Sequence, residues 1–261
     1  MPCIIALNGP GKAGGLLNWQ FKQRGPQSPR VYKIMRKIAL GQVLTFLLLL
    51  ALILFLGIGS TWLLLGATPL GDFRGVVLVI AAFLLVYSYA VAIYRVFLAI
   101  MPLAEVEDIS EGSKEEFVAQ VNILFYLILF NALIRTHFLP IPLLRLVYIA
   151  LGARLGRNTY SAGVILDPPL TTIGDNCIIG HDAVLFSHAI EGEQFSLRAI
   201  RIGNNVTIGA KAVIMSGVTI DDAAIVSAGA VVTKDTHIGA GEVWGGVPAR
   251  LLKRRGTENV A

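Results

Sequence analysis

One aliphatic or aromatic residue recurs at every sixth position in the C-terminal part of the sequence, and this period is the strongest constraint on the fold. The series comprises Ile202, Ile208, Ile214, Ile220, Val226, Val232, Ile238 and Trp244. A helix turns one face inward about every 3.6 residues and a strand every second residue, so neither explains a period of six. A hexapeptide period is typical of a β-helix, in which each repeat forms one side and one corner of a triangular prism. We therefore predict a parallel β-helix with a filled aliphatic core.

The repeat is interrupted at one point. The same phase is present upstream at Ile173, Ile179 and Leu185, but 17 residues, not a multiple of six, separate Leu185 from Ile202. The segment His188–Arg198 is polar enough to leave the prism there as a loop. Because the core of the prism is filled, we expect any chemistry on its corners, on this loop or between subunits. An inert insertion is the alternative.

The N-terminal half of the chain is apolar. Hydrophobic residues make up 55% of the sequence and charged residues only 15%, which is unusual for a soluble domain. The uncharged runs Ile38–Leu65 and Val76–Tyr94 are each long enough to cross a bilayer, and the Gly- and Pro-containing segment between them is typical of a turn. The sequence thus predicts a transmembrane helical hairpin over residues 38–101. The first run is too long, and begins too late, for a secretory signal.

Residues 1–37 form a basic leader with seven Lys or Arg residues and no acidic residue. By the positive-inside rule this end stays in the cytoplasm, and two crossings return the chain there. The chain would then be an integral protein of the cytoplasmic membrane with its β-helix on the cytoplasmic side. The net charge of +5 and pI of 9.3 are better explained by contact with anionic lipids than by nucleic acid, because the basic residues cluster beside the membrane segments.

Residues 102–150 are predicted to form amphipathic helices at the membrane interface. Ser113 and Glu116 have the spacing of a capping box at the start of the first helix. Polar residues interrupt its apolar surface, namely Gln120, Asn122 and Asn131. It is therefore a poor third span, and a shorter amphipathic helix follows after two prolines. If the first helix did cross, the β-helix would face the other side of the membrane.

The segments IRIGNNVTIGAKAVIMSGVTI, SAGAVVTKD and GGVPARLLKR resemble, in this order, the C-terminal part of the hexapeptide-repeat acyltransferases, which include galactoside and maltose O-acetyltransferases. LGARLGRNTY, LDPPLTTIGDN and SHAIEGEQF resemble membrane-attached members, including the C-terminal region of poly-lysine synthetase. The resemblance covers about the last hundred residues. It implies a left-handed β-helix over residues 151–246, a basic helix and tail over 247–261, a homotrimer, and acetyl-CoA or another acyl-CoA as co-substrate, with no metal.

The resemblance also implies a catalytic residue. His188 stands where the prism gives way to the loop, and in the family a histidine at this point removes the proton from an acceptor hydroxyl or amine. Imidazole suits this role because much of it is neutral at cytoplasmic pH. A second group is expected to fix its tautomer, and Asp167 and Glu191 are the candidates. Asp167 could equally be a structural corner residue.

The family binds the acyl donor along the outside of the prism between two subunits. Small residues that admit the pantetheine arm and cations that meet the phosphates match here at Gly209, Ala210, Ala228, Thr233, Lys234, Arg250 and Lys253. One departure is Thr207, where relatives often have tryptophan. Each of these residues could instead be an ordinary repeat corner or a solvated charge.

The sequence therefore predicts a membrane-anchored, trimeric acyltransferase that moves an acetyl or other short acyl group to a membrane-associated acceptor, such as a lipid-linked sugar or a surface-polysaccharide precursor. A non-catalytic scaffold is one alternative. A zinc enzyme like the γ-class carbonic anhydrases is another, but His181, His188 and His237 occupy different phases of the repeat and would point in different directions. Cys177 fits a small core position of the repeat, and Cys3 lies in the leader, so no disulfide is expected.

Overall fold

The computed structural model describes residues 37–136, 138–192 and 194–254. The predicted basic leader, apart from Lys37, and the last residues of the tail therefore lie outside the described residues, as does Cys3.

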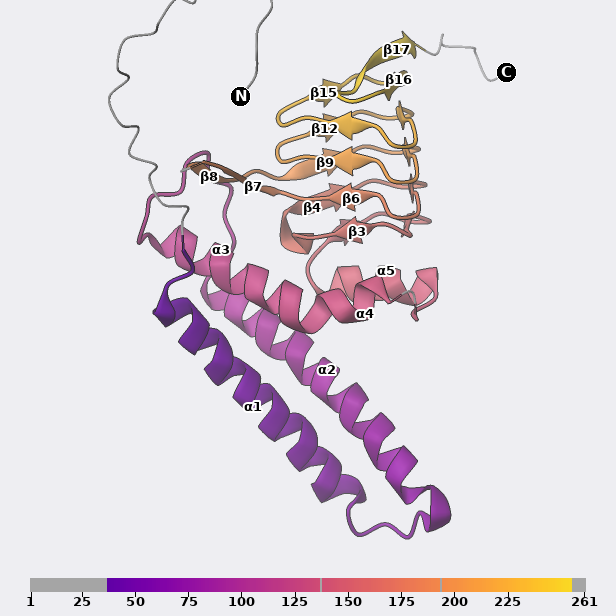
Figure 1. The fold of residues 1–261 in the computed structure, drawn as a ribbon. Coiled ribbons are helices and arrows are strands. Elements are labelled where there is room, and N and C mark those ends of the chain that lie inside the picture. The colour runs from indigo at the N-terminus through magenta and orange to yellow at the C-terminus, as the bar shows by residue number, and fades with distance from the viewer. Residues whose placement is uncertain (1–36, 137, 193, 255–261) are drawn as a thin grey trace, which may run out of the picture. The chain divides into compact units, whose positions relative to one another are not determined.

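Helices α1 (Leu40–Leu65) and α2 (Arg74–Ile100) form an antiparallel pair, joined by a turn with a short 3₁₀ segment, η1 (Gly71–Phe73) (Figure 1). Gly57 lies where the two helices cross. A Cβ at this position would stand 2.5 Å from Val86 Cγ2 and 2.9 Å from Val86 Cα, so the absence of a side chain permits the close approach.

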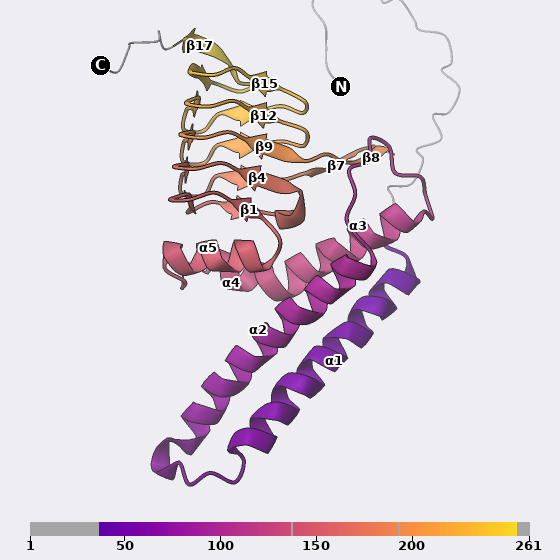
Figure 2. The ribbon, with the colours of Figure 1, turned by 180° about the vertical axis from the view of Figure 1, so that it is seen from behind.

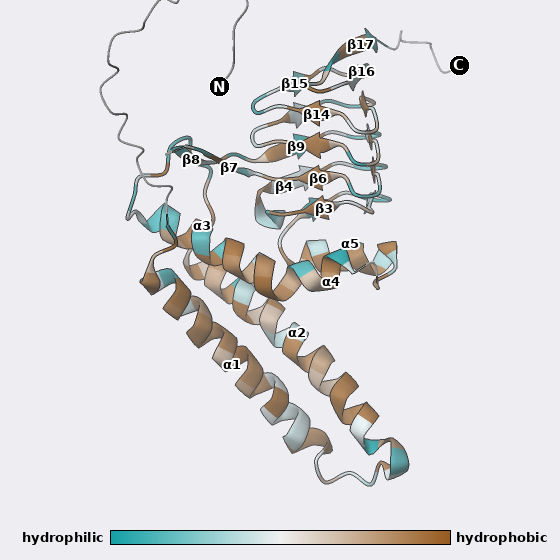
Figure 3. Ribbon diagram, viewed as in Figure 1, coloured by the Kyte–Doolittle hydropathy of each residue, from teal (hydrophilic) through white to brown (hydrophobic). Residues whose placement is uncertain are grey.

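The outward faces of this helix pair are apolar along most of their length (Figure 3). Leu48, Phe55 and Leu63 are each more than two-thirds exposed. In water such a surface would be costly, whereas lipid tails would solvate it. Among the residues that the structure describes, three helical stretches are long and apolar enough to cross a membrane by length and composition: Leu40–Leu65, Gly71–Ile100 and Lys114–Arg135.

The third stretch differs from the other two. It is a continuous helix of α3 (Lys114–Leu124), the π-helical segment η2 (Phe125–Phe130) and α4 (Asn131–Arg135). Ser113 caps it as predicted, since its Oγ accepts from the Glu116 amide at 3.1 Å. Half of its most apolar window is buried, against 17% and 6% for the first two. The stretch therefore packs against protein on much of its surface, and α5 (Ile141–Ala150) follows it.

The C-terminal part is a three-sided parallel β-helix, and each chain turn except the last contributes one strand to each of three sheets (Figure 2). The first sheet comprises β1 (Arg154–Leu155), β4 (Thr171–Ile173), β9 (Ile200–Ile202), β12 (Thr219–Ile220) and β15 (His237–Ile238). The second comprises β2 (Tyr160–Ser161), β5 (Ile178–Ile179), β10 (Thr207–Ile208), β13 (Ile225–Val226) and β16 (Glu242–Gly245). The third comprises β3 (Val164–Ile165), β6 (Val184–Leu185), β11 (Val213–Ile214) and β14 (Val231–Val232).

The residues of the six-residue series fill the core of this β-helix. Ile173, Ile179, Leu185 and the aliphatic series from Ile202 to Ile238 are all at most 4% exposed. Trp244 at the end of the series is only partly buried, and its indole Nε1 donates to Glu242 Oε2 at 2.8 Å. Cys177 is a buried free thiol in the core, as its position in the repeat predicts. The hexapeptide period is confirmed as the source of a parallel β-helix, and the three sheets fit a left-handed one.

The predicted loop is a β-hairpin that projects from the prism after β6. Its strands β7 (His188–Glu191) and β8 (Gln194–Leu197) pair antiparallel, with His188 opposite Leu197. Figures 1 and 2 show this hairpin reaching away from the prism above α3. Phe195 and Leu197 on β8 are buried in a small apolar cluster with Ile109 and Ala119 of the helical region. We name the hairpin β7–β8 the arm.

The prediction of a basic helix within residues 247–261 is wrong for the described part. Residues Arg250–Arg254 form strand β17, which runs antiparallel to β16. The last coil of a β-helix leaves one edge of backbone N–H and C=O groups unpaired, and an added strand satisfies them where a helix could not.

Candidate active site

Four polar residues stack along the corner that follows the third sheet. Asp167, Ser187, Ser216 and Lys234 each stand two residues beyond β3, β6, β11 and β14 respectively. Hydrogen bonds connect these levels: the Ser187 amide donates to Asp167 Oδ2 at 2.9 Å, and Ser216 Oγ donates to the Ser187 carbonyl at 2.7 Å. Register in the sheet thus brings together side chains that lie far apart in the sequence. The arm leaves the prism from this corner.

His188, the first residue of the arm, contacts Asp167 on the preceding turn. His188 Nδ1 lies 2.7 Å from Asp167 Oδ2, and the same oxygen accepts from the His188 backbone amide at 3.2 Å. Asp167 is 1% exposed, whereas a quarter of the His188 side chain reaches solvent. A buried carboxylate accepts from Nδ1–H, so Nε2 is the ring nitrogen that can take up a proton.

The local environment perturbs the pKa of His188 in two directions. Burial disfavours the imidazolium and lowers the pKa, but the negative charge of Asp167 and its hydrogen bond to the ring outweigh burial, so the pKa lies above its ordinary value. The ring is therefore more basic than a free imidazole and remains oriented by the carboxylate.

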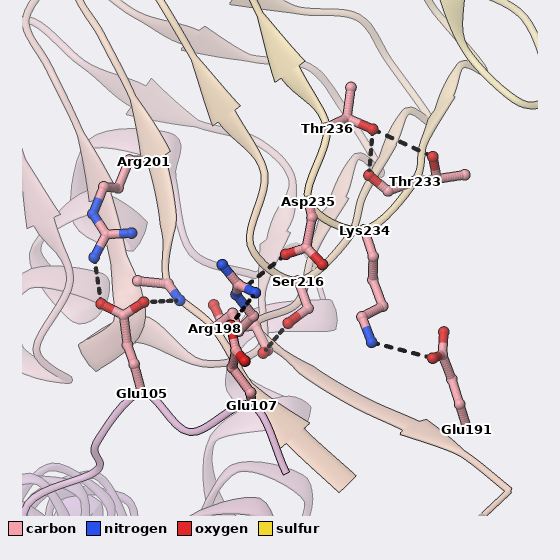
Figure 4. A network of polar contacts seen from close by, with 12 residues as sticks. Glu105, Glu107, Glu191, Arg198, Arg201, Ser216, Thr233, Lys234, Asp235 and Thr236 are labelled. Atoms are coloured by element: carbon pink, nitrogen blue, oxygen red, sulfur yellow. Dashed lines mark hydrogen bonds and ion pairs between the residues drawn. The ribbon is translucent and has the colours of Figure 1, made fainter. Parts of the chain in front are cut away.

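Glu191, the other candidate to orient His188, has a different partner. It lies at the far end of β7, and its Oε2 accepts from Lys234 Nζ at 3.1 Å (Figure 4). The structure therefore places Asp167 against the imidazole, while Glu191 ties the arm to the next-but-one turn of the prism.

The segment between α2 and α3 holds the arm from its outer side. The amides and carbonyls of Val106 and Leu197 exchange two hydrogen bonds of 2.8 Å, and the Ile109 amide donates to the Phe195 carbonyl at 2.8 Å. The linker also forms two ion pairs, Glu105 with Arg201 and Glu107 with Arg198 (Figure 4). Arg198 also lies 3.2 Å from Asp235 Oδ1. Strand β8 of the arm thus lies between β7 and this linker.

Two residues that the sequence did not mark as functional join the site from the helices. Asn122 of α3 donates from Nδ2 to Asp167 Oδ1 at 3.4 Å, and Tyr94 of α2 donates its hydroxyl to Asn122 Oδ1 at 2.6 Å. Tyr94 is 3% and Asn122 1% exposed. In the sequence Asn122 is visible as a polar residue within an apolar helix. Its partner Asp167 lies 45 residues further along the chain, so no local pattern indicates that the two side chains meet.

The small residues predicted for the acyl donor share a different corner, between the second and third sheets. A Cβ on Gly209 would stand 2.3 Å from the Ala228 amide nitrogen, and one on Gly180 would stand 2.5 Å from that of Ala210. Gly180, Gly209 with Ala210, and Ala228 therefore stack on successive turns, and the backbone packs too closely there for larger side chains at the glycines.

The remaining predicted residues lie elsewhere. Thr233 is exposed beside Lys234, on the corner that carries Asp167, and its Oγ1 lies 3.3 Å from Thr236 Oγ1. Arg250 and Lys253 are exposed on β17. Within one chain the seven residues thus fall into three places rather than one pocket.

The three histidines of the zinc alternative have separate partners. His181 Nε2 lies 3.5 Å from Asp182, His188 pairs with Asp167, and His237 Nε2 lies 2.9 Å from Asp221 Oδ2. His181 lines a cavity of about 550 Å³ beside α4 and α5. Over the residues that the structure describes, no three His, Cys, Asp or Glu side chains gather as a metal site would require.

Comparison with known proteins gives the class of the C-terminal domain. Residues 199–234 match the family model "Bacterial transferase hexapeptide (six repeats)", and residues 170–190 match "Hexapeptide repeat of succinyl-transferase". These segments carry the hexapeptide repeat of the transferase family, as the sequence motifs predict.

Individual relatives match part of this chain. The chain is 40% identical over 119 residues to galactoside O-acetyltransferase of Escherichia coli (strain K12), covering 41% of this chain and 57% of that protein. It is 42% identical over 91 residues to γ carbonic anhydrase 1 of Arabidopsis thaliana, covering 35% and 29%. A solved structure of galactoside acetyltransferase in complex with coenzyme A is 34% identical over 40% of this chain and 55% of that one, with a TM-score of 0.34. The chain thus spans less than two-thirds of the length of these relatives.

Proposed function

We propose that this protein is a membrane-anchored acyltransferase that moves an acetyl group from acetyl-CoA to a hydroxyl or amine of a membrane-associated acceptor. The observation that carries the proposal is the contact between His188 Nδ1 and the buried Asp167 carboxylate, on a hexapeptide β-helix related to acetyltransferases. A buried carboxylate that fixes one nitrogen of an imidazole leaves the other nitrogen as a general base.

In the proposed reaction His188 Nε2 takes the proton of the acceptor as its oxygen or nitrogen attacks the thioester carbonyl. The new C–O or C–N bond forms, the tetrahedral intermediate collapses, and the C–S bond breaks. The proton on the imidazolium passes to the departing sulfur, so that CoA leaves as a thiol. Asp167 stabilises the imidazolium that exists between these steps and need not change protonation itself.

We propose a homotrimer with acyl-CoA bound at the seam between neighbouring chains. The support is the separation of the proposed donor residues in one chain. Gly209, Ala210 and Ala228 lie on one corner of the prism, Thr233 and Lys234 lie on the next, and Arg250 and Lys253 lie on the added strand. A second copy could bring one chain's small-residue corner opposite the other's His188 corner.

Membrane anchoring is supported by the apolar outward faces of α1 and α2. We assign the third helix to the interface, because half of its apolar window is buried in the protein and because Asn122 on it points to the β-helix. With two crossings and a basic leader, the β-helix would lie on the cytoplasmic side, where acyl-CoA is available. Confinement to one surface would raise the effective concentration of a lipid-linked sugar or a surface-polysaccharide precursor.

The proposal is tested by mass spectrometry of lipid and glycan extracts from cells that contain the wild-type gene, the His188→Ala variant or no gene. We expect one lipid-attached species to carry an additional acetyl group only with the wild type. A change confined to soluble metabolites would contradict the membrane-associated acceptor.

Two alternatives have their own readouts. A scaffold would bind no CoA thioester, which calorimetry with acetyl-CoA measures directly. The match to γ carbonic anhydrase 1 raises a zinc-dependent reaction as the second candidate, and metal analysis of the purified protein together with CO₂ hydration assays would detect it.

A further inference from the structure

The helical region and the β-helix meet through a buried polar chain that leads to His188. The chain runs from the Tyr94 hydroxyl to Asn122 Oδ1 at 2.6 Å, from Asn122 Nδ2 to Asp167 Oδ1 at 3.4 Å, and from Asp167 Oδ2 to His188 Nδ1 at 2.7 Å. Its first three members are at most 3% exposed. Polar groups of this burial are costly unless they are paired, so their alignment is specific rather than incidental.

Chemistry fixes the direction of each hydrogen bond in this chain. The Asp167 carboxylate can only accept, so the Asn122 amide must present its NH₂ group to it. The carbonyl oxygen of the same amide then faces Tyr94, whose hydroxyl donates. The Tyr94 ring is itself held by Phe125 and Phe130, with ring centroids 5.3 Å and 5.6 Å away. Rotation of the amide would therefore break two hydrogen bonds at once.

The two carboxylate oxygens of Asp167 have different hydrogen-bond partners. Oδ1 accepts from Asn122, and Oδ2 accepts from the Ser187 and His188 amides as well as contacting the His188 ring. Asn122 supplies the side-chain donor from the helical region that restrains rotation of the carboxylate and so keeps Oδ2 directed at Nδ1.

We infer that Asn122 and Tyr94 are positioning residues for His188, which they orient through Asp167, so that the packing of α2 and α3 against the β-helix sets the geometry of the base. The inference rests on the proposed function of His188 as that base. The linker that pairs with the arm at Val106 and Leu197 restrains the same histidine from the other side. The helical region would then be part of the catalytic apparatus in addition to an anchor.

Tyr94→Phe tests the inference most cleanly, because it removes a single hydroxyl. We expect kcat for acetyl transfer to fall roughly three- to tenfold, as the loss of one hydrogen bond allows, with KM for acetyl-CoA unchanged. The acid limb of the pH profile should move to lower pH, because a less firmly held Asp167 raises the basicity of His188 less. Asn122→Leu should have the same signature with a larger loss, about 10- to 100-fold.

Tyr87→Phe is the matched control. Tyr87 lies on the same helix, and its hydroxyl donates to the Leu129 carbonyl of the third helix at 3.1 Å, so the change breaks a comparable contact that does not lead to Asp167. A merely structural role predicts that Tyr94→Phe and Tyr87→Phe lower thermal stability alike and leave the acid limb in place. That result would overturn the inference, even if Asn122→Leu failed to fold.

Titration of the His188 imidazole by NMR, in full-length protein in lipid nanodiscs, separates this inference from the proposed function. The His188 resonance is identified by its loss in His188→Gln. A midpoint that moves to lower pH in Tyr94→Phe but not in Tyr87→Phe supports positioning, even if the wild type transfers no acetyl group. An active wild type whose midpoint is the same in Tyr94→Phe contradicts positioning and leaves the proposed function intact.

Discussion

The helix pair α1–α2 and the β-helix use apolar residues in opposite directions. In the β-helix the aliphatic series points inward and is almost fully buried, whereas on α1 and α2 residues such as Phe55 and Leu63 point outward. The β-helix excludes water from its own core, while the helix pair presents an exposed apolar surface that would be costly in water. An apolar composition alone therefore does not define a core, because the period of the apolar residues decides which side they occupy.

The largest effect that this contrast predicts is on the inner face of β5. Ile179→Ala should lower the free energy of unfolding of the β-helix by about 2–5 kcal/mol, because Ile179 is 1% exposed and its truncation leaves a cavity. The adjacent Ile178 points outward and is 60% exposed, so Ile178→Ala should change the free energy of unfolding by less than about 0.5 kcal/mol. Denaturant titration of both variants measures the difference, and equal losses would contradict the inward-and-outward assignment.

On the helix pair the expected weak point is where the two backbones touch. Gly57→Ala should destabilise the α1–α2 contact by about 1–3 kcal/mol, because the added Cβ would stand 2.5 Å from Val86 Cγ2. Gly59→Ala on the same helix meets no atom within 4 Å and should be neutral. Thermal unfolding in detergent compares the two, and a neutral Gly57→Ala would show that the helices do not pack as described.

At the junction of the two regions, Asp167→Asn should lower kcat by about tenfold or more, because an amide no longer enforces the tautomer or stabilises the imidazolium. The pKa of His188 is raised in the folded protein, so activity in the wild type should rise with pH through a midpoint above about 6.5. In Asp167→Asn the acid limb of the pH–activity profile should move to lower pH. The contact between His188 and Asp167 stabilises the fold fully at pH values below the pKa of His188 in the unfolded chain. This stabilisation is lost as the pH rises through the pKa of His188 in the folded protein. If the acid limb of the pH profile were the same in Asp167→Asn as in the wild type, Asp167 would have no influence on the pKa of His188.

The smallest expected effect is on the outside of the arm. Lys234 and Glu191 form a solvent-exposed ion pair, so Glu191→Gln should cost at most about 1 kcal/mol of stability and leave KM for acetyl-CoA unchanged. Lys234→Ala should cost as little stability yet raise that KM, because we assign Lys234 to the phosphates of CoA. Equal KM values in the two variants would remove Lys234 from the donor site.

The β-helix was predictable from the sequence because its rule is local. Every six residues contribute one inward aliphatic side chain, and the break in this repeat between Leu185 and Ile202 located the arm without any knowledge of contacts. The antiparallel pairing of the arm was not predicted, and neither was β17. Strand β17 depends on backbone groups that β16 leaves unpaired, which is a property of the folded prism rather than of the segment itself.

The candidate site was predictable only in part. His188 followed from its place at the break and from the family resemblance, and Asp167 was one of two candidates for its partner. The choice between Asp167 and Glu191 required the register of β3 and β6, which places the Asp167 carboxylate within 2.7 Å of His188 Nδ1. Asn122 was visible only as a polar interruption, because an apolar helix gives no indication of which distant carboxylate its amide meets.

The most direct test of the account is the rate of acetyl transfer by full-length His188→Ala that still binds acetyl-CoA as the wild type does. If His188 is the base, the rate should fall by about 10²- to 10⁴-fold. Transfer at the wild-type rate would contradict the account, because the acceptor's proton would then leave by another route.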